Sequence, residues 1–140
     1  MIAVIRIHGK VGLKKDIQET LSRLNLKKKY SCIVLQEDNV QKGMIKKVKD
    51  FVAYGGVDDK TFIELIKKRG KKIDTSKKID SEKIVEEIKK GKKYEELNLK
   101  PFFNLHPPRG GIESKKHFGV KKGVLGDNKN QINNLIRRML

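Results

Sequence analysis

The chain lacks the features of secreted and membrane proteins. It has a single cysteine, Cys32, so it cannot form an internal disulfide, and a reducing cytosol is the expected compartment. No run approaches the roughly 20 apolar residues that cross a bilayer. The apolar start, residues 1–5, stops at Arg6 and has neither a charged leading region nor a small-residue cleavage site. We therefore expect a cytoplasmic protein without a membrane segment or secretory signal.

The sequence also lacks the usual constellations of catalysis and metal binding. The single cysteine and three histidines, His8, His106 and His117, have no CxxC or HxxxH spacing, so no metal site is predicted. P-loop, GxGxxG and GxSxG motifs are absent. The paired acids, such as Asp58-Asp59, are typical of helix ends and solvated helix faces. We predict no catalytic residues, no cofactor and no small-molecule substrate.

Acidic residues are scarce relative to basic ones. The 140 residues include 34 Lys and Arg but only 17 Asp and Glu, which gives a formal net charge of +17. Charged residues make up 36% of the chain and hydrophobic residues another 36%, whereas charged residues are about 25% of a typical domain. The composition allows one modest core, and so large a positive excess favours a polyanionic partner.

The apolar pattern of the first 70 residues predicts alternating strands and helices. Runs rich in β-branched and aromatic residues predict strands at 2–7, 31–36 and 51–54. Helical spacing predicts helices at about 12–24, from Asp38 or Asn39 onward, and from Asp58 or Asp59 to Gly70. We expect an α+β fold with a small ferredoxin-like βαβαβ core, a three-stranded sheet and helices on one face. The order of the strands stays open.

Composition divides the chain into three segments. Residues 1–70 form the predicted core domain. Residues 71–100 are rich in Lys, Glu and Ile and predict a peripheral charged helical segment, whose helix is capped by Asp80 or Ser81. Residues 101–140 form a basic extension rich in Gly and Pro, which ends in a helix capped by Asn130. Because Phe102 and Phe103 are too apolar for a free tail, we expect this extension to fold against the core and partly against a partner.

Basic clusters are the dominant feature and are typical of a distributed contact with a phosphate backbone. Any one of them is equally well explained as solvation of a helix face, but solubility does not require so high a net charge. The lysines and arginines predicted to bind RNA are Lys14, Lys15, Lys28, Lys29, Lys46, Lys47, Lys115, Lys116, Arg137 and Arg138.

Two glycine-containing turns are sharper candidates for RNA contact. His8, Gly9 and Lys10 follow the first strand, where glycine permits close approach and a helix N-terminus offers free N–H groups to phosphate. Gly43 falls at the predicted start of a short helix and could let RNA lie against the helix end. A plain β–α turn and simple flexibility are the competing explanations for these two sites.

The segment 106–111, with sequence HPPRGG, is a third candidate. Its prolines make an extended, stiff segment that presents Arg109 at little entropic cost, and Arg can form paired hydrogen bonds with phosphate or guanine. A rigid connector with no contact from Arg109 is the alternative. The residues predicted here to bind RNA are His106, Pro107, Pro108, Arg109 and Gly110.

The order of these features resembles one known family. The sequences GMIKKV at 43–48 and LHPPRGG at 105–111 closely resemble the archaeal branch of the large-subunit ribosomal protein family numbered thirty, whose eukaryotic members are numbered seven. The resemblance covers nearly the whole chain and is weakest over 71–100. It implies a ribosome-bound, non-enzymatic structural constituent of the large (50S) subunit that binds 23S-type and 5S ribosomal RNA and supports subunit assembly. A non-ribosomal RNA-binding or RNA-chaperone-like protein, and a small enzyme acting on an anionic substrate, are the alternatives.

Overall fold

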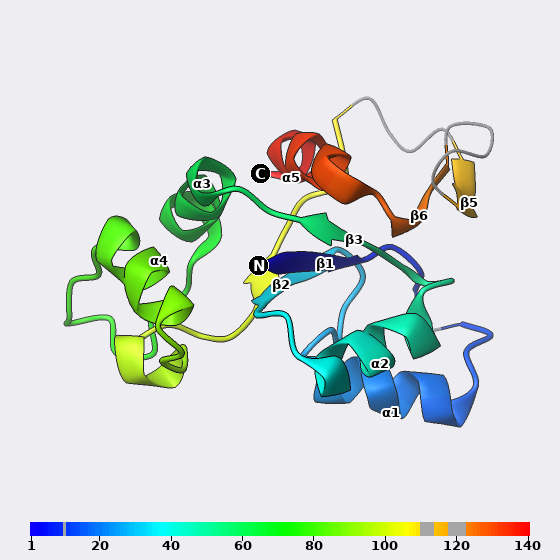
Figure 1. Cartoon of the computed structure of the whole chain (residues 1–140), viewed down its shortest axis with the longest axis horizontal. Coiled ribbons are helices and arrows are strands. Elements are labelled where there is room, and N and C mark those ends of the chain that lie inside the picture. The colour runs from blue at the N-terminus through cyan, green and yellow to red at the C-terminus, as the bar shows by residue number, and fades with distance from the viewer. Residues whose placement is uncertain (10, 110–113, 118–122) are drawn as a thin grey trace.

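A computed structural model describes residues 1–9, 11–109, 114–117 and 123–140. Its helices and strands follow one another along the chain as shown in Figure 1. They are β1 (Ile2–Arg6), α1 (Lys15–Arg23), β2 (Ser31–Leu35), α2 (Asn39–Val48), β3 (Val52–Gly56), α3 (Asp59–Arg69), α4 (Ser81–Lys89), β4 (Phe103–Asn104), β5 (Ser114–His117), β6 (Gly123–Asp127) and α5 (Ile132–Met139). Short 3-10 helices lie at Glu95–Leu97 and Lys129–Gln131.

The strands form one sheet in the order β4-β2-β1-β3-β6-β5. β1 lies between β2 and β3 and is antiparallel to both, with Val4 opposite Ile33 on one side and Tyr54 on the other. The outer strands are added differently: β4 pairs antiparallel with β2, whereas β6 pairs in parallel with β3. β1 is thus the central strand of the fold.

The two faces of the sheet are covered by different helices (Figure 1). Successive residues of a strand point to opposite faces, and in β1 both sets are buried. Val4 packs with apolar residues of α1 and α2, including Leu21 and Ile45. Its neighbours Ala3 and Ile5 pack into a larger cluster with residues of α3, α4 and α5. This larger cluster contains residues from each of the ranges 1–70, 71–100 and 101–140.

The α+β class and the ferredoxin-like core are confirmed, but the sheet is wider than predicted. The predicted three-stranded sheet corresponds to β1, β2 and β3. In the structure, β4 pairs with the outer edge of β2, and β6 pairs with the outer edge of β3. The expectation of helices on one face likewise holds only for α1 and α2. Since β1 is apolar on both sides, it needs a layer of helices on each face to exclude water.

Aspartates at the predicted positions begin three of the helices. The side chains of Asp38, Asp58 and Asp80 accept hydrogen bonds from backbone N–H groups in the first turns of α2, α3 and α4. Such caps satisfy donors that have no partner within the helix.

The end of the chain is docked onto β3. A Cβ at Gly55 would clash with the carbonyl oxygen of Lys129 and lie 3.1 Å from the side chain of Ile132, so the backbones approach here as only glycine allows. The amide of Asn133 accepts a hydrogen bond from the Asp58 N–H (2.9 Å) and donates one to the Gly56 carbonyl (3.2 Å). The turn after β3 is thereby fixed to α5.

Candidate nucleic-acid interface

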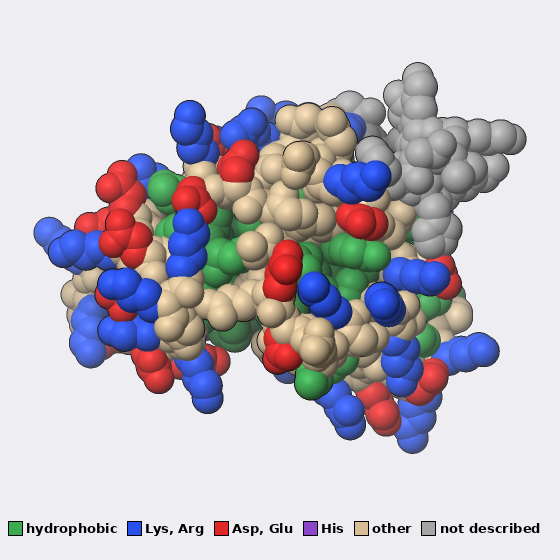
Figure 2. Space-filling model, in the orientation of Figure 1, with side chains coloured by type: hydrophobic (Ala, Val, Ile, Leu, Met, Phe, Trp, Pro, Cys, Tyr) green, Lys and Arg blue, Asp and Glu red, His purple; other side chains and the backbone are tan. Residues whose placement is uncertain are grey.

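Basic side chains are spread over the molecule rather than gathered in a single patch. Figure 2 shows Lys and Arg over most of the visible face, interspersed with acidic side chains. Most of the predicted RNA-binding residues fall into three groups, which we call the loop group (His8, Gly9, Lys28, Lys29), the helix-end group (Lys14, Lys15, Lys46, Lys47) and the C-terminal group (His106 to Arg109, Arg137, Arg138). Lys115 and Lys116 lie within β5, and the predictions for Lys10 and Gly110 fall outside the described residues.

The loop group is assembled by Arg6, at the end of β1. Its guanidinium is buried, with 4% of the residue exposed. It donates hydrogen bonds to the carbonyl oxygens of His8 (2.9 Å), Leu26 (2.8 Å) and Gly9 (3.4 Å). In return, the Arg6 carbonyl accepts from the N–H of Tyr30 at 2.7 Å. Because these bonds join the β1–α1 and α1–β2 connections, the two loops lie side by side.

Burial also shifts the pKa of Arg6 without changing its charge at neutral pH. Desolvation lowers the pKa of its guanidinium, but an arginine starts so high that it stays charged at neutral pH. Arg6 was not among the predicted site residues. An isolated arginine within the otherwise apolar run 2–7 is the signal that could have revealed it, since a buried cation needs specific partners.

The side chains of the loop group differ in their freedom. The His8 ring meets the Phe51 ring edge to face, with 5.4 Å between the centroids, and its Nδ1 lies 3.0 Å from the Gly9 carbonyl oxygen. Lys28 and Lys29 are exposed, and the Lys29 ammonium lies 5.0 Å from the centre of the Tyr30 ring. The loop therefore holds its histidine in place and presents its lysines to solvent.

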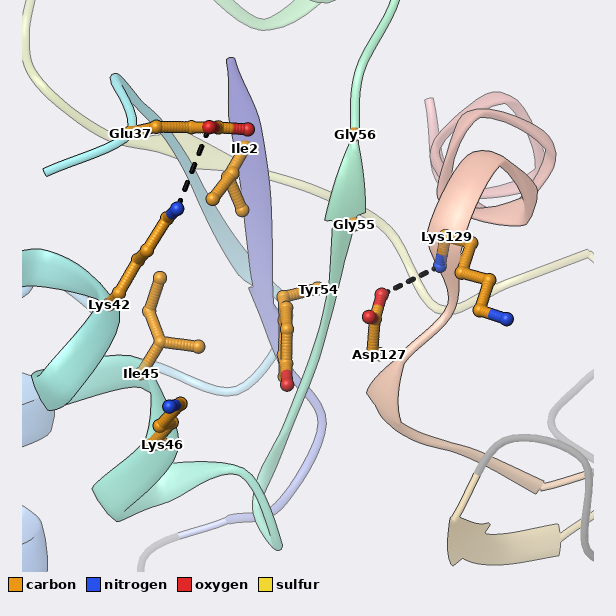
Figure 3. Close-up of a pocket in the computed structure, with 10 residues that line it drawn as sticks. All are labelled: Ile2, Glu37, Lys42, Ile45, Lys46, Tyr54, Gly55, Gly56, Asp127 and Lys129. Atoms are coloured by element: carbon orange, nitrogen blue, oxygen red, sulfur yellow. Dashed lines mark hydrogen bonds and ion pairs between the residues drawn. The ribbon is translucent and has the colours of Figure 1, made fainter. Parts of the chain in front are cut away.

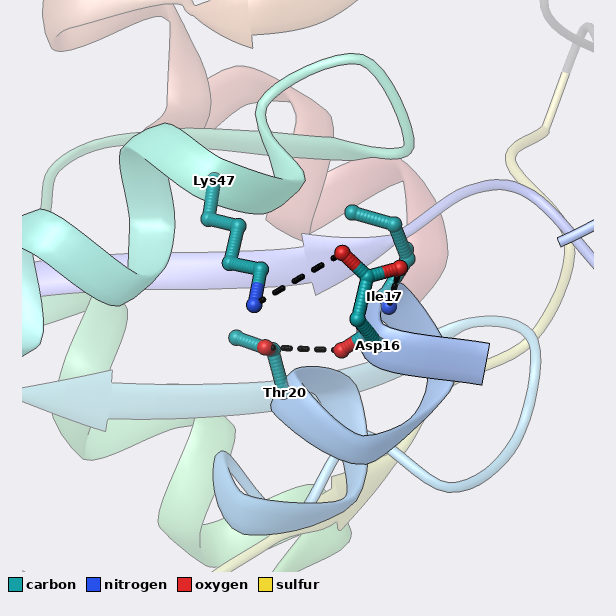
Figure 4. Close-up of polar contacts among 4 residues, drawn as sticks. All are labelled: Asp16, Ile17, Thr20 and Lys47. Carbon is teal, nitrogen blue, oxygen red and sulfur yellow. Dashed lines mark hydrogen bonds and ion pairs between the residues drawn. The ribbon is translucent and has the colours of Figure 1, made fainter. Parts of the chain in front are cut away.

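The end of α2 meets the start of α1 at Lys47, whereas Lys46 lines the pocket beside Tyr54. The Lys47 ammonium lies 3.8 Å from the Asp16 carboxylate (Figure 4). Both side chains are largely exposed, and exposed ion pairs contribute only about 0–1 kcal/mol. Lys14 and Lys15 are also exposed and stand just before Asp16 in the chain. A phosphate could therefore compete with Asp16 for Lys47 at little cost.

Gly43 lies in the interior of α2 rather than at its start. The helix begins at Asn39 because Asp38 caps it, one turn before Gly43. Gly43 is exposed, and a Cβ there would have no neighbour within 4 Å. The fold itself does not need a glycine here. The predicted position of Gly43 at the start of the helix is wrong, and its contact with RNA stays a prediction.

The C-terminal group is held together by backbone hydrogen bonds. The Arg109 N–H donates to the Arg138 carbonyl (3.0 Å), and the Arg138 Nε donates back to the Arg109 carbonyl (3.0 Å). The His106 N–H donates to the Met139 carbonyl at 2.9 Å. The 106–109 segment thus lies along the end of α5 and brings Arg109 beside Arg138.

The C-terminal group adjoins the loop group. The N–H of Leu105, just before His106, donates to the Tyr30 carbonyl at 3.1 Å. Tyr30 therefore connects to Arg6 through its N–H and to the 105–109 segment through its carbonyl. Two groups that are far apart in the sequence share one end of the sheet, and both present cations there.

A pocket beside Tyr54 has mixed charge. It encloses about 350 Å³ between α2, β3 and the residues after β6, and Tyr54 stands between its two walls (Figure 3). Lys42 faces Glu37 at 3.6 Å, and the Asp127 carboxylate accepts a hydrogen bond from the Lys129 N–H at 2.9 Å. Burial, together with Asp127, raises the pKa of Tyr54. Lys42, Lys46 and Lys129 share this pocket with two carboxylates, so it does not present a purely cationic surface to phosphate.

Other kinds of site are not found in the part of the chain that the structure describes. There, no three His, Cys, Asp or Glu side chains gather in a way that could hold a metal ion. Of the helices in the same part, none has the length and apolar content to cross a membrane.

Comparisons with known proteins point in one direction. A family model of ribosomal protein L30p/L7e matches residues 2–52. Large ribosomal subunit protein uL30 of Methanococcus vannielii is 37% identical, over 99% of this chain and 98% of its own length. The uL30 proteins of Methanosphaera stadtmanae and Nanoarchaeum equitans are 34% and 38% identical and are aligned over all of this chain, with 100% and 99% of their own lengths covered. Similarity at this level along both full lengths shows that the chain belongs to the archaeal uL30 (L30p/L7e) family of large ribosomal subunit proteins.

Proposed function

We propose that the protein is a structural constituent of the large ribosomal subunit, that it binds 23S-type and 5S ribosomal RNA and that it supports subunit assembly. The observation that carries this proposal is the full-length similarity to proteins named for the large ribosomal subunit. The family is structural and not enzymatic. A net charge of +17 suits a protein that works among RNA phosphates.

The arrangement of cations supports a division of roles in RNA binding between the lysines and Arg109. Exposed lysines such as Lys28, Lys29 and Lys46 neutralise phosphates and release counterions, which gives affinity but little geometry. Arg109 differs because its backbone is fixed at both N–H and carbonyl by Arg138, and its planar side chain can form two parallel hydrogen bonds. We propose that the lysines position the protein and Arg109 sets its orientation.

Substitution of Arg109 tests this division. Arg109→Ala is expected to weaken binding to large-subunit RNA by about 1–3 kcal/mol, because a charge-assisted hydrogen bond is lost while the backbone bonds to Arg138 remain. Lys77→Ala removes an exposed cation from the 71–80 connection and serves as the control. Filter binding at fixed salt measures both, and equal losses for the two variants would refute the special role of Arg109.

Co-sedimentation separates the ribosomal role from that of a free RNA-binding or RNA-chaperone-like protein. A structural constituent is expected to stay with the large subunit through a high-salt wash, whereas a protein held only by lysine–phosphate contacts dissociates. Release of all the protein in the wash would favour the alternative. Crosslinking and sequencing of the bound RNA would then identify which RNA is contacted.

A further inference from the structure

We propose that a second pocket captures one unpaired ribonucleotide, with its base stacked on Phe102 and its phosphate bound by lysines. The pocket lies between the α1–β2 connection and the start of β4. It is lined by Asn25, Lys27, Lys28, Lys71, Phe102 and Asn104, along with Ser31. This inference rests on the proposed function, because it assigns a specific contact to an RNA-binding protein.

Three distant parts of the chain build this pocket. Pairing of β4 with β2 places Asn104 opposite Ser31, which fixes one wall. The Lys100 N–H donates to the Lys71 carbonyl at 2.9 Å, which holds Lys71 near the chain that leads into β4. The family model matches residues 2–52 only, so Lys71, Phe102 and Asn104 lie beyond the matched region. The pocket therefore exists only where the second half of the chain folds against the first.

Phe102 is placed differently from the phenylalanine that follows it. Phe103 is fully buried in the cluster with α3, α4 and α5. Phe102 belongs to the opposite face, where it packs only partly against the α1–α2 cluster and lines the pocket. Its ring thus keeps an accessible part beside three lysines. Aromatic rings among cations are the usual platforms for single-stranded nucleic acid, because every base has a π face that can stack.

The polar groups and the size of the pocket fit one nucleotide. Lys27, Lys28 and Lys71 supply cations for phosphate, and the amides of Asn25 and Asn104 can both donate to and accept from a base edge. The pocket encloses about 250 Å³, which is below the range of about 300–1,000 Å³ that holds a whole drug-sized ligand and far above the roughly 30 Å³ of one water. It therefore has room for one base, with the ribose and phosphate at its mouth. Among the described residues, no carboxylate lines it, in contrast to the pocket at Tyr54.

Matched variants of the full-length chain test the proposal. Phe102→Leu keeps an apolar side chain but removes the stacking face, and it is expected to lower the affinity for a short oligoadenylate by about 5- to 100-fold. Its affinity for a blunt-ended duplex RNA of equal length should not change, since paired bases cannot enter the pocket. Tyr54→Leu, in the pocket of mixed charge, should leave both affinities unchanged, and Phe102→Tyr should keep the parent affinity.

One further readout, crosslinking of the parent protein, keeps the outcomes distinct. Ultraviolet irradiation of the parent protein on oligoadenylate should attach a nucleotide at residue 102, which does not depend on how any variant folds. The pocket is refuted if Phe102→Leu binds oligoadenylate as well as the parent, if it loses duplex binding equally, or if irradiation labels other residues only. If the parent binds neither oligoadenylate nor large-subunit RNA, the proposed function itself fails.

Discussion

The Arg6 guanidinium is a buried positive charge at the end of β1, and backbone carbonyl oxygens accept its hydrogen bonds. The guanidinium carries five N–H donors in a rigid plane, which suits it to several acceptors at once. Here the acceptors belong to two separate loops, at His8 and Gly9 and at Leu26. Arg6 is therefore a positioning residue for the loop group rather than a direct contact to RNA.

Removal of the Arg6 guanidinium is expected to destabilise the protein. Arg6→Met should lower the free energy of unfolding by about 1–3 kcal/mol, because it leaves buried carbonyl oxygens without donors. Arg23→Met removes an exposed arginine from the last turn of α1 and should change stability by less than about 0.5 kcal/mol. Urea denaturation measures both variants, and similar losses would contradict a structural role for Arg6.

Asp58 links stability to pH at the level of a single side chain. Hydrogen bonding from Thr61 to its carboxylate lowers the pKa of Asp58 in the folded protein, and Arg137 lowers it further. A carboxyl whose pKa is lower folded than unfolded stabilises the fold above the unfolded pKa of about 4, and this stabilisation is lost as the pH falls through the folded pKa.

Two substitutions at Asp58 separate its charge from its role as a cap. Asp58→Ala should cost about 1 kcal/mol at neutral pH, and the difference from the parent should shrink in acid. Asp58→Asn still caps α3 but cannot titrate, so it should retain most of the neutral stability and lose this pH dependence. Thermal unfolding at a series of pH values tests both, and a pH-independent loss in Asp58→Ala would contradict the linkage.

At the scale of elements, we expect alanine substitutions at two glycines to change the stability in opposite directions. Gly43 lies in the exposed interior of α2 with open space around it, so Gly43→Ala should raise stability by about 0.5–1 kcal/mol. Gly55 lies against the Lys129 carbonyl, so Gly55→Ala should lower stability by about 1–3 kcal/mol by forcing β6 and α5 away from β3. Denaturant unfolding compares the two, and a shift of the same sign would contradict the packing described here.

The elements that sequence patterns predicted well are those with strong local signals. The strands β1, β2 and β3 stand out as β-branched runs, and α2, α3 and α4 begin at aspartates that the sequence marks as caps. β4 and β6 were not predicted, because β4 has two residues and β6 contains two glycines. β4 and β6 form by pairing with the outer edges of β2 and β3. Local sequence patterns do not reveal such pairing between distant segments.

The candidate site was predictable in its residue types but not in its grouping. Exposed lysines and the HPPR stretch stand out in the sequence at once. Their neighbours do not, because the approach of Arg109 to Arg138 depends on the docking of α5. The contribution of Arg6 and the pocket at Phe102 also depend on contacts between segments that lie far apart in the chain.

At the scale of the whole molecule, charge should dominate the response of RNA binding to salt. Each phosphate neutralised contributes about 0.7–0.9 to the slope of log affinity against log salt concentration, so a footprint that spans the three groups should give a slope of several units. Lys46→Ala should reduce this slope by up to about one unit. Titration of large-subunit RNA at increasing salt measures the slope, and a flat titration would count against binding through the phosphate backbone.

The seating of β6 on the outer edge of β3 constrains when folding can finish during synthesis. Chains emerge from the N-terminus first, so the edge of β3 stays open until β6 is made. The apolar face that includes Ala3 and Ile5 is covered only in part, by α3 and α4, until α5 appears. An open strand edge beside exposed apolar surface invites association with other chains. A polypeptide cut short before Gly123 should therefore aggregate instead of forming a smaller native domain, because it lacks both β6 and α5, which close the structure.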